Sequence, residues 1–108
     1  MLTTLIYRSQ LNLSRPSTEL RELVERARGR NTKLAITGVL LANGNEVQQI
    51  LEGSEESVVK LFHTIREDKR HSGVVELLRD YGPRRRFENV GMLLFDLQTQ
   101  SPKEVLQS

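Results

Sequence analysis

The sequence predicts an α+β fold, a ferredoxin-like sandwich in the order β-α-β-β-α-β-β. Two segments carry apolar residues at i, i+3, i+4 and i+7, the spacing of an amphipathic helix. β-rich segments flank both of them, and Asn43-Gly44 between two such segments is a strong hairpin signal. Because each helix has one apolar stripe, both should cover the same face of a five-stranded mixed sheet.

The first strand and the first helix come from the N-terminal part of the chain. Residues Leu2 to Ser9 are β-rich and are followed by the polar stretch from Gln10 to Ser14. Ser17 is the predicted N-cap of the helix, and Gly29 is its predicted end. The apolar stripe of this helix consists of Leu20, Leu23, Val24 and Ala27.

The middle of the chain should form a hairpin and then the second helix. The hairpin strands are predicted over Leu34 to Leu41 and from about Glu46 to Glu52. Ser54 is the predicted N-cap of the second helix, and Glu55 and Glu56 suit the positive end of its dipole. Its apolar stripe consists of Val58, Leu61, Phe62 and Ile65.

The C-terminal part should add two strands. They are predicted over Val74 to Tyr81 and Asn89 to Leu97, with a turn at Gly82-Pro83 between them. We therefore expect one domain over residues 1–97. Residues 98–108 should begin a C-terminal linker or capping helix, starting at Ser101-Pro102.

Composition describes a soluble globular domain and excludes several classes of protein. A chain of 108 residues can bury one core but not two. The absence of cysteine excludes a disulfide framework, a thiolate metal site and a cysteine nucleophile. The N-terminus has no signal-peptide layout, and no apolar stretch approaches the roughly 20 residues that span a bilayer. We therefore expect a cytoplasmic protein without a membrane segment.

Three polar residues stand out as candidates for a binding site: Tyr7, Asn31 and Gln49. Side chains alternate along a strand, so Gln49 shares a face with Val47 and Leu51 and should point toward the helices. A buried phenol and a buried amide both need partners, which are either each other or a ligand. Such groups can hydrogen-bond a planar heterocycle, and they include no hydrolytic nucleophile and no metal cage.

Several motifs are spread along residues 1 to about 97. They are Leu5-Ile6-Tyr7-Arg8-Ser9, Ala27 and Asn31, Ile36-Thr37-Gly38-Val39-Leu40-Leu41, Gln49-Ile50-Leu51-Glu52-Gly53, Asp68-Lys69-Arg70-His71, and Arg86-Phe87 before Gly91-Met92. Together they closely resemble the BLUF family, the blue-light sensor domains that use FAD. The ordered set at this spacing is specific, although each motif alone is weak. The Glu76–Tyr81 segment is similar to that of sensor modules fused to EAL-type cyclic-di-GMP proteins of enteric bacteria.

The resemblance implies a non-enzymatic photoreceptor that binds FAD noncovalently and holds no metal. The isoalloxazine would lie between Leu23 and Ile65 of the two helices. Asn31 would bond the O4/N3 edge of the ring, and Arg30 would lie near O2. The residues implied to be near the ring or the phosphoribityl chain are Arg70 and His71, and those implied to be photoactive are Tyr7, Gln49 and the neighbouring Met92.

The same resemblance implies a mechanism and a partner. Rotation or tautomerisation of the Gln49 amide would change the group that faces flavin O4 and produce a red-shifted flavin. The partner would be a fused or separate output domain, for which the subgroup suggests an EAL-type cyclic-di-GMP phosphodiesterase, and a homodimer stays open. The sequence departs from the family at positions where aromatic residues are common, which are Ala42, Val47, Gln48 and Val90.

Two other functions of the same fold are alternatives. An RNA-binding domain would display strand aromatics, but the chain has only five aromatic residues and no RNP-like motif. An acylphosphatase-like hydrolase would need a phosphate loop after the first strand, where Gln10 to Pro16 contains no glycine. With a net charge of only +2, the Arg84-Arg85-Arg86 run fits a solvated turn better than a nucleic-acid patch.

Overall fold

The computed structural model describes residues 2–14, 16–87 and 91–97. The order of elements in these residues is the predicted β-α-β-β-α-β-β. The helices are α1 (Pro16–Lys33) and α2 (Glu55–Glu67), and the strands are β1 (Leu2–Leu11), β2 (Thr37–Asn43), β3 (Glu46–Gly53), β4 (His71–Gly82) and β5 (Leu93–Asp96).

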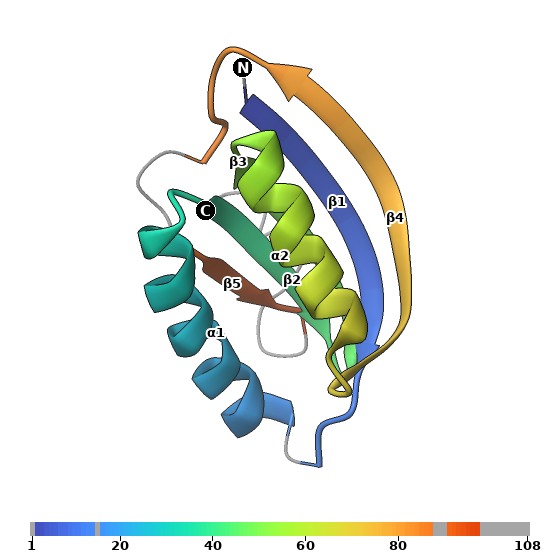
Figure 1. Cartoon of the computed structure of the whole chain (residues 1–108). Coiled ribbons are helices and arrows are strands. Elements are labelled where there is room, and N and C mark those ends of the chain that lie inside the picture. Colours follow the sequence, from blue (N-terminus) through green and yellow to red (C-terminus); the bar gives the residue numbers. More distant parts are fainter. Residues whose placement is uncertain (1, 15, 88–90, 98–108) are drawn as a thin grey trace.

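The five strands form one mixed sheet in the order β4-β1-β3-β2-β5. Neighbouring strands are antiparallel except for β2 and β5, which are parallel. Both helices lie on the same face of the sheet, as predicted: α2 crosses β1 and β3, and α1 lies beside β2 and β5 (Figure 1). The core fills the space between the helices and the sheet, and the predicted helix stripes supply much of it, with Leu20, Val24, Val58 and Phe62 almost fully buried.

The ends of α1 differ from those predicted. The helix begins at Pro16, so an N-cap at Ser17 is wrong. Proline suits the first helical position because the N–H that it lacks would have no partner there. The helix also runs past Gly29 to Lys33. A glycine costs a helix only about 1 kcal/mol, which burial of Ala27 and Asn31 on either side can offset.

The helix ends instead in a Schellman motif. The N–H of Ile36 donates to the carbonyl of Asn31 at 2.8 Å, and the N–H of Ala35 donates to that of Thr32 at 3.2 Å. Ala35 takes the left-handed conformation that glycine usually supplies, with φ 54°. Because this exit uses residues 34–36, β2 begins at Thr37 and not at the predicted Leu34.

The remaining boundaries are close to the prediction. Ser54 caps α2 by accepting a hydrogen bond from the N–H of Ser57, as expected. The hairpin loop is Gly44-Asn45, one residue later than Asn43-Gly44, and Gly44 has φ 63°. The strand β4 begins at His71, three residues before the predicted Val74. The strand β5 is shorter than predicted, and both the predicted start at Asn89 and the predicted helix at Ser101-Pro102 lie outside the described residues.

Candidate cofactor site between the two helices

Tyr7 and Gln49 form a buried pair at the centre of the sheet. The register of β1 and β3 places them directly opposite each other, and both side chains point toward the helices. Tyr7 is fully buried and Gln49 is 5% exposed. The Tyr7 hydroxyl donates a hydrogen bond to Oε1 of Gln49. Burial raises the pKa of Tyr7 above its usual value of 10, so the phenol is neutral and keeps its proton.

The other end of the Gln49 amide faces Met92. Nε2 of Gln49 lies 3.6 Å from the Met92 sulfur, and Met92 is buried. Gly38 on β2 makes this arrangement possible. A Cβ at Gly38 would lie 2.2 Å from the Ile50 carbonyl oxygen and 3.6 Å from the Met92 methyl group. The glycine of the Ile36-Thr37-Gly38 motif therefore lets the strand pack closely and leaves room for Met92.

A cavity of about 270 Å³ lies between α1 and α2, and Gln49 is one of the residues that line it. Six of the seven residues that the resemblance assigned to the cofactor line it, so the fold brings these six side chains together. Leu23 and Ile65 give it apolar sides, and Gln49 gives it an amide. The full lining is Leu23, Arg26, Ala27, Arg30, Gln49, Ile65, Asp68, Arg70 and His71.

Asn31 is the seventh residue, and it does not line the cavity. It lies in the last turn of α1 and not after the helix as predicted. Its side chain is fully buried, and Nδ2 donates to the carbonyl of Gly91 at 2.8 Å. Its Oδ1 accepts from Nε of Arg30 at 3.3 Å. In this structure the amide therefore joins α1 to the segment before β5.

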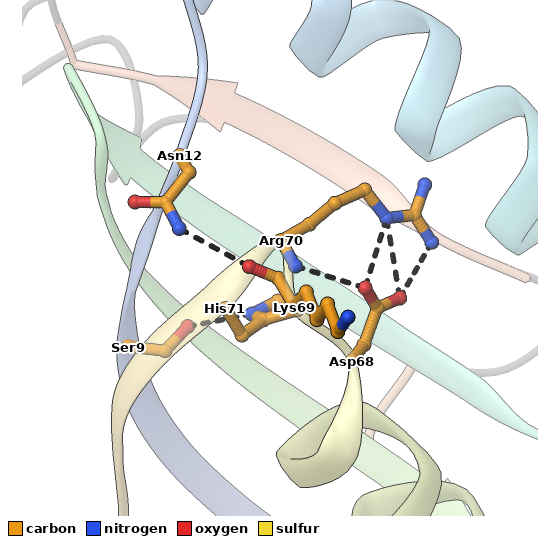
Figure 2. A network of polar contacts seen from close by, with 6 residues as sticks. All are labelled: Ser9, Asn12, Asp68, Lys69, Arg70 and His71. Carbon is orange, nitrogen blue, oxygen red and sulfur yellow. Dashed lines mark hydrogen bonds and ion pairs between the residues drawn. The ribbon is translucent and has the colours of Figure 1, made fainter.

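A polar network holds the mouth of the cavity, where α2 passes into β4 (Figure 2). Arg70 donates to the Asp68 carboxylate, with Nη2 2.6 Å from Oδ2, and this interaction lowers the pKa of Asp68 to about 2. The Ser9 hydroxyl lies 2.9 Å from Nδ1 of His71. Burial lowers the pKa of His71 below its usual value, so this imidazole is neutral near pH 7.

Sequence reasoning missed three lining residues: Arg26, Ala27 and Asp68. A signal for two of them existed, because Leu23, Arg26, Ala27 and Arg30 lie at i, i+3, i+4 and i+7 on one side of α1. Ala27 was assigned to the core, and its small side chain leaves space in the cavity. Asp68 belongs to the Asp68–His71 motif, but its pairing with Arg70 depends on the turn after α2.

The site suits a flat, anionic cofactor such as FAD. Apolar side chains face the cavity from both helices, and an amide is available to a polar ring edge. Three arginines, Arg26, Arg30 and Arg70, outnumber the one lining carboxylate, Asp68, so the lining carries positive charge for a phosphate-bearing group. In the part of the chain that the structure describes, no three His, Cys, Asp or Glu side chains are grouped so that they could hold a metal ion. No helix among the described residues is long and apolar enough to span a membrane.

Known proteins resemble this chain over its whole length. An antirepressor regulated by blue light and temperature, BluF of Escherichia coli K12, is 47% identical over 108 residues, which are 100% of this chain and 27% of that protein. The structure of Klebsiella pneumoniae BlrP1 in complex with manganese and cyclic di-GMP is 50% identical, with a TM-score of 0.90. The match covers 99% of this chain and 27% of BlrP1.

A bacterial light-regulated adenylyl cyclase of known structure is also similar. It is 31% identical with a TM-score of 0.88, and the match covers 99% of this chain and 33% of the cyclase. The chain thus spans about a quarter to a third of the length of these relatives. The family model described as sensors of blue light using FAD matches residues 2–93. The chain therefore belongs to the BLUF family, whose members are blue-light sensor modules that use FAD.

Proposed function

We propose that this domain binds FAD noncovalently between α1 and α2 and signals light by rearranging the hydrogen bonds of Gln49. The observation that carries the proposal is the buried contact series Tyr7–Gln49–Met92, whose central residue, Gln49, lines the cavity. Bound FAD would supply the absorption of blue light and the electron-accepting chemistry. Leu23 and Ile65 would hold the ring on its two sides, with Arg30, Asn31, Arg70 and His71 around its polar parts.

The two ends of the Gln49 amide are held unequally. A neutral phenol donates to Oε1, whereas among the described residues Nε2 has only the thioether sulfur of Met92, which is a weak acceptor. Rotation of the amide, or its tautomerisation, in which Oε1 gains a proton while Nε2 gives one up and Tyr7 ends neutral, would exchange donor and acceptor without moving the backbone. The flavin ring bound in the cavity would then face a hydrogen-bond donor in place of an acceptor, or the reverse, and the absorption of the flavin would shift.

The rearrangement would be read by an output domain, either fused to this module or separate. Among the relatives, BlrP1 was solved with cyclic di-GMP, and another is a light-regulated adenylyl cyclase. An EAL-type cyclic-di-GMP phosphodiesterase is the partner that fits the sequence subgroup. Nucleotide second messengers act inside the cell, so the proposed location is the cytoplasm.

Absorption spectra before and after blue illumination test the function. The FAD-loaded protein should be yellow, and its flavin bands should shift to longer wavelength in light and return in the dark. Tyr7→Phe should keep the flavin and lose the shift, because the ring packing stays while the hydroxyl is removed. Tyr81→Phe is the matched control, because Tyr81 is the only other tyrosine, and it is exposed.

Three results would overturn the proposal. The first is a protein that stays colourless after reconstitution with FAD, which would show that the domain does not bind FAD. The second is a yellow protein without a light-induced shift, which would show that the domain binds FAD but does not sense light. The third is a normal, long-lived shift in Tyr7→Phe, which would place the photoactive role at another residue.

A further inference from the structure

Glu52 is a buried carboxylate that the site described so far does not use. It lies three residues after Gln49 on β3, and strand alternation places it on the face without helices. Its neighbours in the sheet are Thr4 on β1 and Thr37 on β2. Glu52 is only 1% exposed, so a segment outside the sheet must cover it.

That segment is the connection between β4 and β5. The backbone N–H of Arg86 lies 3.0 Å from each carboxylate oxygen of Glu52, and the N–H of Phe87 donates to Oε1 at 2.9 Å. The hydroxyl of Thr4 donates to Oε2 at 3.3 Å. Hydrogen bonds to a charged acceptor are strong, and leaving such a group buried without partners is costly. The carboxylate therefore ties the connection to the end of β3.

Arg85 strengthens the same attachment. Its Nη1 donates to the Glu52 carbonyl at 2.9 Å and to the Thr37 hydroxyl at 3.0 Å, and its Nη2 donates to the carbonyl of Ala35. The arginine run was predicted to be a solvated turn. For Arg85 this is wrong, because its guanidinium joins the connection to the start of β2 and to the end of β3.

The connection is held a second time just before β5. The carbonyls of Gly91 and Met92 accept hydrogen bonds from Asn31 and Arg28 of α1, both at 2.8 Å. A Cβ at Gly91 would lie 3.1 Å from the Arg28 carbonyl oxygen, so the backbone packs directly on the helix. The segment is thus fixed at residues 85–87 and 91–92, and the second point places the Met92 sulfur beside Gln49.

We propose that Glu52, together with Arg85, is a positioning residue for the photoreaction. By anchoring the β4–β5 connection at residues 85–87, it adds to the contacts of Arg28 and Asn31 that hold Met92 against Gln49, and through Met92 it sets how fast the light state returns to the dark state. This inference rests on the proposed function. Without the Glu52 anchor, only the α1 contacts hold Met92, so it supports the dark orientation of the Gln49 amide less well and the return to that orientation slows.

The experiment measures the rate at which the red-shifted state decays in the dark. Glu52→Gln keeps the size of the side chain but loses the charge that the backbone N–H groups bind. We expect the FAD content and the dark spectrum of this variant to stay as in wild type, with decay about threefold slower or more. Glu46→Gln is the control, because Glu46 is exposed on the same strand and the same face.

A double-mutant cycle separates positioning from a general structural effect. In a Met92→Leu background of similar volume, Glu52→Gln should have no further effect on the decay, because its effect passes through the Met92 sulfur. An equal slowing with and without Met92 would overturn the proposal, since Glu52 would then act by another route. Wild-type decay in Glu52→Gln would overturn it directly.

If Glu52→Gln does not fold or does not bind FAD, Arg85→Lys tests the positioning proposal in its place. It keeps the charge but loses the forked hydrogen bonds, and it should slow the decay in the same direction. Wild-type decay in this variant would then overturn the proposal. A wild-type protein without any light-induced shift would instead contradict the sensing function, so the two failures are distinguishable.

Discussion

At the residue scale, the photoactive pair consists of two polar side chains, Tyr7 and Gln49, that are almost fully buried. Strand alternation correctly predicts that Gln49 points inward with Val47 and Leu51. Its pairing with Tyr7 follows from the register of β1 against β3, which no local pattern in the sequence specifies. Alternation also predicts the face of Glu52, but not its burial, because the segment that covers it comes from more than thirty positions later in the chain.

Asn31 is the residue whose role in binding is least evident from its contacts. Both ends of its amide have partners in the protein, Gly91 and Arg30. Asn31→Ala should weaken FAD binding by about 0.5–1.5 kcal/mol, or more if the Gly91 carbonyl is left buried and unpaired. Titration of the FAD-free protein measures this, and the exposed Asn43→Ala at the end of β2 is the control. Unchanged affinity in Asn31→Ala would show that the residue does not support the ring.

His71 should make the stability of the FAD-free protein depend on pH. Burial lowers its pKa from the ordinary 6.5; nearby Arg70 and Arg30 act in the same direction, and Asp68 opposes them. Below pH 6.5 the unfolded chain therefore binds more protons than the folded protein, and stability falls as the pH falls.

Urea unfolding at about pH 7.5 and about pH 5.5 measures this loss. His71→Gln should reduce it, because the variant has no imidazole to protonate at this position. His63→Gln on the exposed side of α2 should retain it, and His63 is the only other histidine. An equal loss in wild type and in His71→Gln would contradict the prediction.

At the element scale, apolar periodicity correctly predicted both helices, and β-rich segments correctly predicted the order of elements along the chain. The ends were predicted less well, because they depend on backbone conformation and hydrogen bonding. Gly29 looked like the end of α1, but the helix ends at a Schellman motif that has alanine, not glycine, in the left-handed position. The strand β4 begins early because Asp68 and Arg70 fix the turn that precedes it.

Ala35 offers a test of this helix end. With φ 54°, an alanine is strained by roughly 1 kcal/mol relative to glycine. Ala35→Gly should therefore raise the free energy of unfolding by about 0.5–1 kcal/mol, which denaturant titration can measure. The control is Ala27→Gly within α1, which should lower the free energy of unfolding by a similar amount or more. A loss of stability in Ala35→Gly would contradict the assigned backbone conformation.

At the scale of the whole molecule, the cavity exists because both helices lie on one face of the sheet. The two apolar stripes predicted that arrangement. The family resemblance, and not spacing, predicted which residues meet there. Contacts such as that of Gln49 with Met92 join residues far apart in sequence, so only the folded chain shows them. Arg26 was missed because a charged residue on an amphipathic helix reads as solvent-facing.

The light-minus-dark absorption difference of Gln49→Leu and Gln48→Leu tests most directly whether Gln49 is the light switch. The two glutamines are adjacent on β3, but Gln49 is buried against the helices and Gln48 is exposed. Gln49→Leu should bind FAD with an altered dark spectrum and show no red shift, because it lacks the amide. Gln48→Leu should keep the wild-type dark spectrum and red shift. A normal shift in Gln49→Leu, together with its loss in Gln48→Leu, would contradict the account.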